Sequence, residues 1–192
     1  GSDSGLGETS IPARLQSGDK LVAYQFEGYW KDVGTLDSLW DANMDMLSPG
    51  SGLNLLDSRW PIYSRTPSAP PAYVGENADI GNSAVAKGCE ILGEVKNSVL
   101  SYNTIVGEGA SVSYSVLMPG AVVEPGARVQ YAIVGEGAVI GCGACVGAPP
   151  EEAKDPESWG VAVLGPGTRV APGEKLGAKT MLDRTHGQEV QE

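Results

Sequence analysis

The sequence predicts a mainly β fold, a three-sided parallel β-helix built from hexapeptide repeats. Three consecutive stretches of 17 residues align on one another without gaps, namely Asn97–Ser113, Tyr114–Gln130 and Tyr131–Gly147. In each of them a large aliphatic residue returns at steps of six, six and five positions, and a small residue stands two positions before it. Units this short cannot bury an apolar face alone, so they must stack on their neighbours.

Both series occupy every expected position of the three units. The aliphatic residues are Leu100, Val106, Val112, Leu117, Val123, Val129, Val134, Ile140 and Val146. The small residues are Ser98, Thr104, Ala110, Ser115, Ala121, Ala127, Ala132, Ala138 and Ala144. A helix would place apolar residues at steps of three and four, and a half-buried strand would alternate. The rhythm of six instead indicates a triangular coil in which each short face points one aliphatic side chain inward.

The same rhythm continues on both sides of the three units, so we expect the β-helix to span residues 72–182. Val74 and Ile80 precede the units, and downstream Leu164, Val170 and Leu176 again step by six. The intervening segment 148–160 is acidic and rich in proline, and it supplies no aliphatic residue to the series. This composition predicts a loop inserted at one corner of the β-helix. We expect residues 183–192 to form a flexible tail.

Residues 1–48 have a different pattern, which predicts a short α/β segment joined to the coils by a linker at 49–71. The run Leu21–Phe26 (LVAYQF) predicts a strand. Thr35 is a candidate helix N-cap, with Asp37 in the first turn. Apolar residues then follow at helical spacing on one side, and Pro49-Gly50 ends the predicted helix. They are Leu36, Leu39, Trp40, Met44 and Leu47.

The composition excludes several classes of partner and site. The formal net charge of −11 argues against nucleic acid and anionic membranes. No run of about 18 apolar residues could span a membrane. The three cysteines are Cys89 and a lone C-x-x-C pair, Cys142 and Cys145, and the only histidine is His186. A zinc site needs more ligands than these. We expect inert thiols in a reducing cytoplasm, and a redox pair of Cys142 and Cys145 is the alternative.

Three strings resemble the C-terminal part of bacterial glucose-1-phosphate adenylyltransferases. They are EGYWKDVGT (27–35), LDSLWDANMDML (36–47) and DSRWPIYS (57–64), the last being similar to the family's DRNWPIYT. The resemblance covers roughly 11–182. It implies that the β-helix is left-handed and that the segment before it is the remnant of a nucleotidyltransferase domain.

The resemblance also implies a function. Enzymes of this family join glucose 1-phosphate to ATP, release pyrophosphate and form ADP-glucose for glycogen synthesis, with Mg²⁺ as the metal. In the complete enzyme Asp32 would be a metal ligand; the alternative is a turn carboxylate before Val33-Gly34. The family assembles as a homotetramer through the β-helix. Lys179 and Arg184 are the candidates for binding an allosteric sugar phosphate, Arg65 is a weaker one, and solvated surface charge is the alternative for all three.

The sequence also departs from the family pattern. It lacks the glycine-rich nucleotide loop of the GGxGTRL type, the second metal-binding aspartate and the Glu-Lys-Pro element that holds the sugar phosphate. A lone carboxylate cannot hold a triphosphate. We therefore expect this chain to be part of a larger enzyme, without a complete catalytic set and inactive on its own.

Two other functions stay open at this point. Hexapeptide acyltransferases share the coils but usually rely on a histidine base, and no coil here contains histidine. Sugar-phosphate nucleotidyltransferases of other specificity, for mannose or thymidine nucleotides, are also possible relatives. For the chain as given, an assembly or regulatory module is the role we expect.

Overall fold

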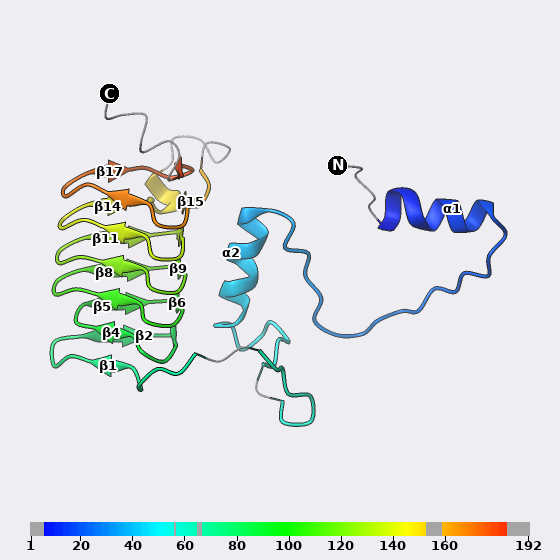
Figure 1. Ribbon diagram of the computed structural model, residues 1–192, viewed down its shortest axis with the longest axis horizontal. Helices are drawn as coiled ribbons and strands as arrows, with labels where there is room; N and C mark the ends of the chain where they lie inside the picture. The colour runs from blue at the N-terminus through cyan, green and yellow to red at the C-terminus, as the bar shows by residue number, and fades with distance from the viewer. Residues whose placement is uncertain (1–5, 56, 65–66, 153–158, 184–192) are drawn as a thin grey trace.

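A three-sided parallel β-helix dominates the computed structural model, which describes residues 6–55, 57–64, 67–152 and 159–183 (Figure 1). Its strands are two or three residues long and form three parallel six-stranded sheets, which we call faces 1, 2 and 3. Strand neighbours within each face are three strands apart in the chain, so the chain visits face 1, face 2 and face 3 in turn. The predicted fold class is confirmed.

The strands of each face follow one another along the axis of the β-helix. Face 1 consists of β1 (Tyr73–Val74), β4 (Glu90–Ile91), β7 (Ile105–Val106), β10 (Val122–Val123), β13 (Val139–Ile140) and β16 (Arg169–Val170). Face 2 consists of β2 (Asp79–Gly81), β5 (Glu94–Lys96), β8 (Ser111–Ser113), β11 (Arg128–Gln130), β14 (Cys145–Val146) and β17 (Lys175–Leu176). Face 3 consists of β3 (Ala84–Val85), β6 (Val99–Leu100), β9 (Val116–Leu117), β12 (Ala132–Val134), β15 (Ala162–Leu164) and β18 (Met181–Leu182).

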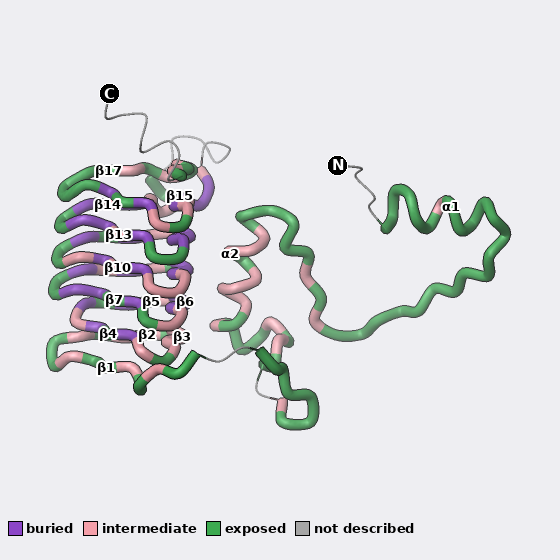
Figure 2. The backbone as a smooth tube through the Cα atoms, viewed as in Figure 1, coloured by how far each residue is buried: buried purple, intermediate pink, exposed green. Residues whose placement is uncertain are grey.

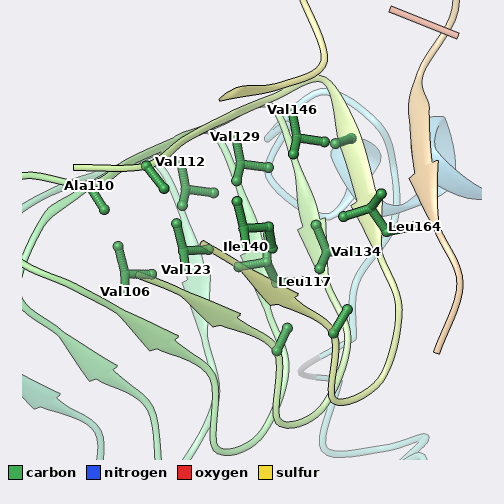
Figure 3. Packing of buried hydrophobic residues seen from close by; sticks show 14 of the residues in the cluster. Val106, Ala110, Val112, Leu117, Val123, Val129, Val134, Ile140, Val146 and Leu164 are labelled. Atoms are coloured by element: carbon green, nitrogen blue, oxygen red, sulfur yellow. The ribbon is translucent and has the colours of Figure 1, made fainter. Parts of the chain in front are cut away.

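The core is the column of aliphatic side chains that the sequence predicts. All nine aliphatic residues and all nine small residues of the three units are buried, none more than 2% exposed. Figure 3 shows the aliphatic side chains from different faces pointing toward one another inside the β-helix. Each coil therefore covers the core of the next, and fully burying one such side chain contributes roughly 1.5–3 kcal/mol.

Two of the three corners are tight turns with a residue of positive φ, usually glycine. At the corner after face 3, Ala121 N donates to Met118 O at 3.2 Å, and Gly120 between them has φ of 71°. Ala127 closes the equivalent turn after face 1, with Gly126 at the same φ. Glycine adopts a positive φ at this position of a turn without strain, and Asn103 takes the position equivalent to Gly120 with φ of 59°. The small residue follows at once because it sits in the crowded bend.

The third corner, between face 2 and face 3, is one residue shorter and is made differently. Asn82, Asn97, Tyr114 and Tyr131 occupy it in successive coils, all with positive φ between 42° and 47°. Asparagine adopts this conformation readily, and a bulky residue rarely does. The shorter corner explains the step of five in the repeat, and it places two tyrosines in a strained backbone conformation.

The strand register locates the extra chain at one corner. The offset between neighbouring strands of face 3 is 17 residues for Val116 and Ile133 but 30 for Ala132 and Ala162. The 13 additional residues equal the length of 148–160. Within that segment the structure describes 148–152, including the short 3-10 helix η2 (Pro150–Glu152), and 159–160. The tail from residue 184 onward lies outside the described residues.

Within residues 6–48 the N-terminal segment contains three helical elements, and the predicted strand is absent. They are η1 (Leu6–Ser10), α1 (Ile11–Gln16) and α2 (Leu36–Asp45), the last being the predicted helix. The strand predicted at Leu21–Phe26 is wrong: these residues form no strand and are exposed, as Figure 2 shows for most of this segment. A strand needs a neighbour to accept its backbone hydrogen bonds, and the described chain supplies none here. No helix of the described residues is long and apolar enough to cross a lipid bilayer.

Removing one inward side chain tests the column. Leu117 is fully buried, so Leu117→Ala leaves a cavity between two neighbouring coils and should lower the free energy of unfolding by about 2–5 kcal/mol. Denaturant titration followed by circular dichroism measures this loss. The exposed Lys175→Ala on face 2 is the control and should change stability by no more than about 0.5 kcal/mol. Equal losses for the two variants would contradict an inward column.

Candidate functional site

Asp32 lies in an exposed turn directly before α2. Its Oδ1 accepts a hydrogen bond from Gly34 N at 2.9 Å, which bends the chain toward the helix. Thr35 then caps α2: Thr35 Oγ1 accepts from Ser38 N, and Ser38 Oγ accepts from Thr35 N. This reciprocal pair satisfies backbone donors that a helix start leaves without partners. In this chain the Asp32 carboxylate therefore stabilises the turn that precedes α2.

Tyr29 and Lys31, just before Asp32, contact α2 through a hydrogen bond and two ion pairs. Lys31 Nζ pairs with Asp45 at 2.7 Å and also with Asp41, and Tyr29 Oη donates to Asp45 Oδ2 at 2.9 Å. The hydrogen bonds from Lys31 and Tyr29 lower the pKa of Asp45 below its ordinary value. The carboxylates raise the pKa of Lys31, chiefly through its hydrogen bond to Asp41. The GYWKDVGT string thus folds back on the helix that follows it.

The described residues do not by themselves fit a magnesium site. Within residues 6–55, 57–64, 67–152 and 159–183, no group of three or more His, Cys, Asp and Glu side chains could hold a metal ion. Magnesium takes oxygen ligands in near-octahedral geometry, and Asp32 has one of its oxygens engaged with Gly34. Further ligands would have to come from residues that this part of the chain does not provide.

Helix α2 lies against face 3 of the β-helix (Figure 1). A second apolar cluster, separate from the core, forms at this contact. Its members are Leu39, Trp40 and Met44 from α2, and Val116, Met118, Ile133, Val161 and Val163 from the β-helix. Val116 and Ile133 point away from the core, yet they are only 2% and 4% exposed because α2 covers them. The helix therefore docks as an integral part of the fold.

An aromatic cluster extends this contact to the loop at 148–160. Tyr114 and Tyr131 stack with ring centroids 4.7 Å apart, and Trp40 and Trp159 approach Tyr131 at 6.0 Å and 5.5 Å. Trp40 Nε1 also donates to Tyr114 O at 2.8 Å, and Trp159 Nε1 donates to Ala148 O at 2.9 Å. The strained tyrosine corner is thus the point where helix, coils and loop meet.

Of the predicted effector residues, only Lys179 can be placed. It lies at the same corner as the tyrosines, with φ of 60°, and its N donates to Gly160 O at 2.8 Å. A hollow of about 500 Å³ beside Gly160 is lined by Asp37 and Asp41 among others, which does not favour an anion. Arg184, Arg65 and His186 lie outside the described residues.

The cysteines are free thiols in positions that suit the expected inert role. Cys89 is buried, Cys142 is exposed and Cys145 is half-buried. Cys142 Sγ donates to Glu124 Oε2 at 3.2 Å, and this hydrogen bond is the main cause that raises the pKa of the thiol. Burial raises the pKa of Cys89. Both shifts reduce the thiolate fraction and hence reactivity.

Sequence comparison finds a matching family model for each of the two parts of this arrangement. Residues 70–162 match the model described as GlmU-like, C-terminal hexapeptide, and residues 2–49 match that of nucleotidyl transferase. Proteins named glucose-1-phosphate adenylyltransferase from Clostridioides difficile (strain 630) and Clostridium botulinum (strain Eklund 17B / Type B) are each 50% identical to this chain, over 111 and 116 residues. Over these residues the chain is similar to bacterial glucose-1-phosphate adenylyltransferases.

The homology covers only part of these proteins. The matched residues are 58% of this chain and 29% of the Clostridioides difficile protein, and 60% and 31% for the relative from Bacillus cereus (strain ATCC 10987 / NRS 248). The chain thus spans about three tenths of the length of the curated relatives it matches. The predicted resemblance is confirmed over this region.

The link between Lys31 and α2 can be tested by titration. Because the folded pKa of Asp45 is lowered, its pairing stabilises the protein above its ordinary pKa of about 3.9 and is lost as the pH falls through the folded pKa. Lys31→Met should raise the pKa of Asp45, measured by carboxyl NMR titration. Lys20→Met, in the exposed segment before it, should leave that pKa unchanged. An unchanged value in Lys31→Met would show that the ion pair is not formed.

Proposed function

We propose that this chain is the assembly and regulatory C-terminal part of a glucose-1-phosphate adenylyltransferase. The observation that carries the proposal is the docking of α2, from the segment matched to nucleotidyl transferases, on face 3 of the coils matched to hexapeptide proteins. One chain therefore contains the junction between a catalytic domain and a β-helix, and relatives of the same name match across about 60% of it.

Exposed apolar residues of the N-terminal segment and the linker support a catalytic domain outside this chain. Val22, Tyr24, Trp30, Trp60 and Tyr63 are each at least 75% exposed. So many large apolar side chains in water are unusual for a folded protein, and we take them as residues that another part of the complete protein covers. In the complete protein we expect Leu21–Phe26 to join a sheet whose other strands precede this chain.

The activity of the complete protein follows from the same proposal. It would transfer the adenylyl group of ATP to glucose 1-phosphate, release pyrophosphate and form ADP-glucose in the cytoplasm. Mg²⁺ would supply charge neutralisation at the phosphates, with Asp32 as one ligand. Lys179 and Arg184 remain our candidates for an effector phosphate. The β-helix would join the subunits into a homo-oligomer, which is a tetramer by analogy with the family.

Fusion to a catalytic domain tests this proposal. The purified chain should release no pyrophosphate from ATP and glucose 1-phosphate. Joined behind the N-terminal part of the Clostridioides difficile relative, it should give an active enzyme that forms ADP-glucose.

Asp32 is tested in the fused enzyme. Asp32→Asn should lower kcat by roughly 100-fold, because a metal ion contributes several kcal/mol to stabilising the transition-state charge. Asp37→Asn removes an exposed carboxylate five residues away and should leave kcat unchanged. Activity of the chain alone, or an inactive fused protein that is folded, would refute the proposed function. Full activity of Asp32→Asn would refute the metal role only.

A further inference from the structure

Face 1 carries an open apolar stripe on its outward side. Its outward residues lie in register along the β-helix and are Tyr73, Glu90, Ile105, Val122, Val139 and Arg169. From β4 to β16 the other residue of each strand is buried in the core. Ile105 is 37% exposed, and Val122 and Val139 are half-buried. Three apolar side chains in a row thus face solvent.

The other two faces show why this stripe needs an explanation. On face 2 the outward residues are mainly polar or charged: Asp79, Glu94, Ser111, Arg128, Cys145 and Lys175. On face 3 the outward residues are apolar, and α2 covers Val116 and Ile133. Among the described residues no helix lies on face 1 (Figure 1). Helix α2 thus covers the apolar side chains at the centre of face 3, and the polar face 2 needs no cover. Face 1 is apolar at its centre and remains uncovered among the described residues.

Charges of opposite sign flank the stripe. Glu90 lies one strand before Ile105, and Arg169 lies one strand after Val139. Both side chains are exposed, and neither has an ion-pair partner among the described residues. The order along the face is therefore acidic, apolar, apolar, apolar, basic, with Val122 at the centre.

We propose that face 1 pairs with face 1 of a second copy of this chain. The two copies are related by a two-fold axis that lies between the two faces and passes next to Val122. The inference rests on the assembly role proposed above and names its surface. This axis is parallel to the strands of face 1, so the β-helix axes of the two copies run in opposite directions. Val122 then meets the partner's Val122, Ile105 meets the partner's Val139, and Glu90 meets the partner's Arg169. Such an interface is self-complementary, as a two-fold dimer requires.

The charges also select this arrangement over its alternative. A two-fold axis parallel to the β-helix would place the two copies in the same coil order. Glu90 would then face the partner's Glu90, and Arg169 would face the partner's Arg169, which is unfavourable at an interface. The stripe from Glu90 to Arg169 spans four strand intervals, or about 19 Å at about 4.8 Å per interval. The flat row of short strands lets both copies stay in register over that length.

The central residue gives the first test. Val122→Asp places two carboxylates against each other on the axis, and should raise the dimer dissociation constant of the full chain by at least about 100-fold in sedimentation equilibrium. Ser111→Asp is the matched control, since Ser111 is a half-buried outward residue on face 2. It should leave the dissociation constant unchanged. Circular dichroism checks that both variants keep the fold.

Charge reversal gives the second and sharper test. Glu90→Arg or Arg169→Glu alone replaces two attractive pairs of the dimer with two repulsive ones, and each should weaken association by about tenfold. The double variant restores opposite charges and should recover the original dissociation constant. Recovery requires Glu90 of one copy to lie near Arg169 of the other.

Three results would overturn the interface: a monomeric wild-type chain, an oligomer indifferent to Val122→Asp, or a double variant as weak as the single ones. None of these measurements uses catalysis. Their failure is therefore distinct from inactivity of the fused enzyme, which would refute the adenylyltransferase assignment instead.

Discussion

Every part of this structure depends on the burial of one aliphatic side chain per face by the coils above and below it. No coil of 17 residues can cover its own inward residues, and ordering those residues costs roughly 1–2 kcal/mol of backbone entropy each. Each buried aliphatic residue contributes roughly 1.5–3 kcal/mol against that cost, and it does so only when neighbouring coils complete the column. The small residue two positions earlier is also required, because a larger side chain at the corner would not fit between neighbouring coils.

Since the inward positions are fixed by this column, the outward positions are free to differ, and each face has a different surface. Face 3 is apolar where α2 docks, face 2 is mainly polar or charged, and face 1 has an apolar centre between opposite charges. The β-helix thus serves as a scaffold that presents one surface to α2 and, in our proposal, another to a second subunit. The aromatic cluster around Tyr131 connects the first of these surfaces to the inserted loop.

The sequence was sufficient for the features that repeat. Each inward aliphatic and small residue of the three units was predictable because the period recurs without a break. The strained tyrosines at positions 114 and 131 were not, since tyrosine is not a residue typical of positive φ. The only signal was the step of five, which shows that one corner is short. The pairing of Lys31 with Asp41 and Asp45 also escaped prediction, because it depends on how a turn folds back on a helix. The strand predicted at Leu21–Phe26 failed because a strand is made by its neighbours, and they are absent from the described chain.

The removal of one whole coil tests the central claim most directly. Deletion of Tyr114–Gln130 joins Ser113 to Tyr131 and leaves every inward residue above a residue of the same kind. The account predicts a β-helix that is one coil shorter, with a cooperative thermal transition and an unchanged circular dichroism spectrum per residue. Deletion of Tyr114–Ala127, which is three residues shorter, should abolish that transition because it breaks the column. Loss of cooperative unfolding on removal of the full coil, or equal stability of the two deletions, would contradict the account.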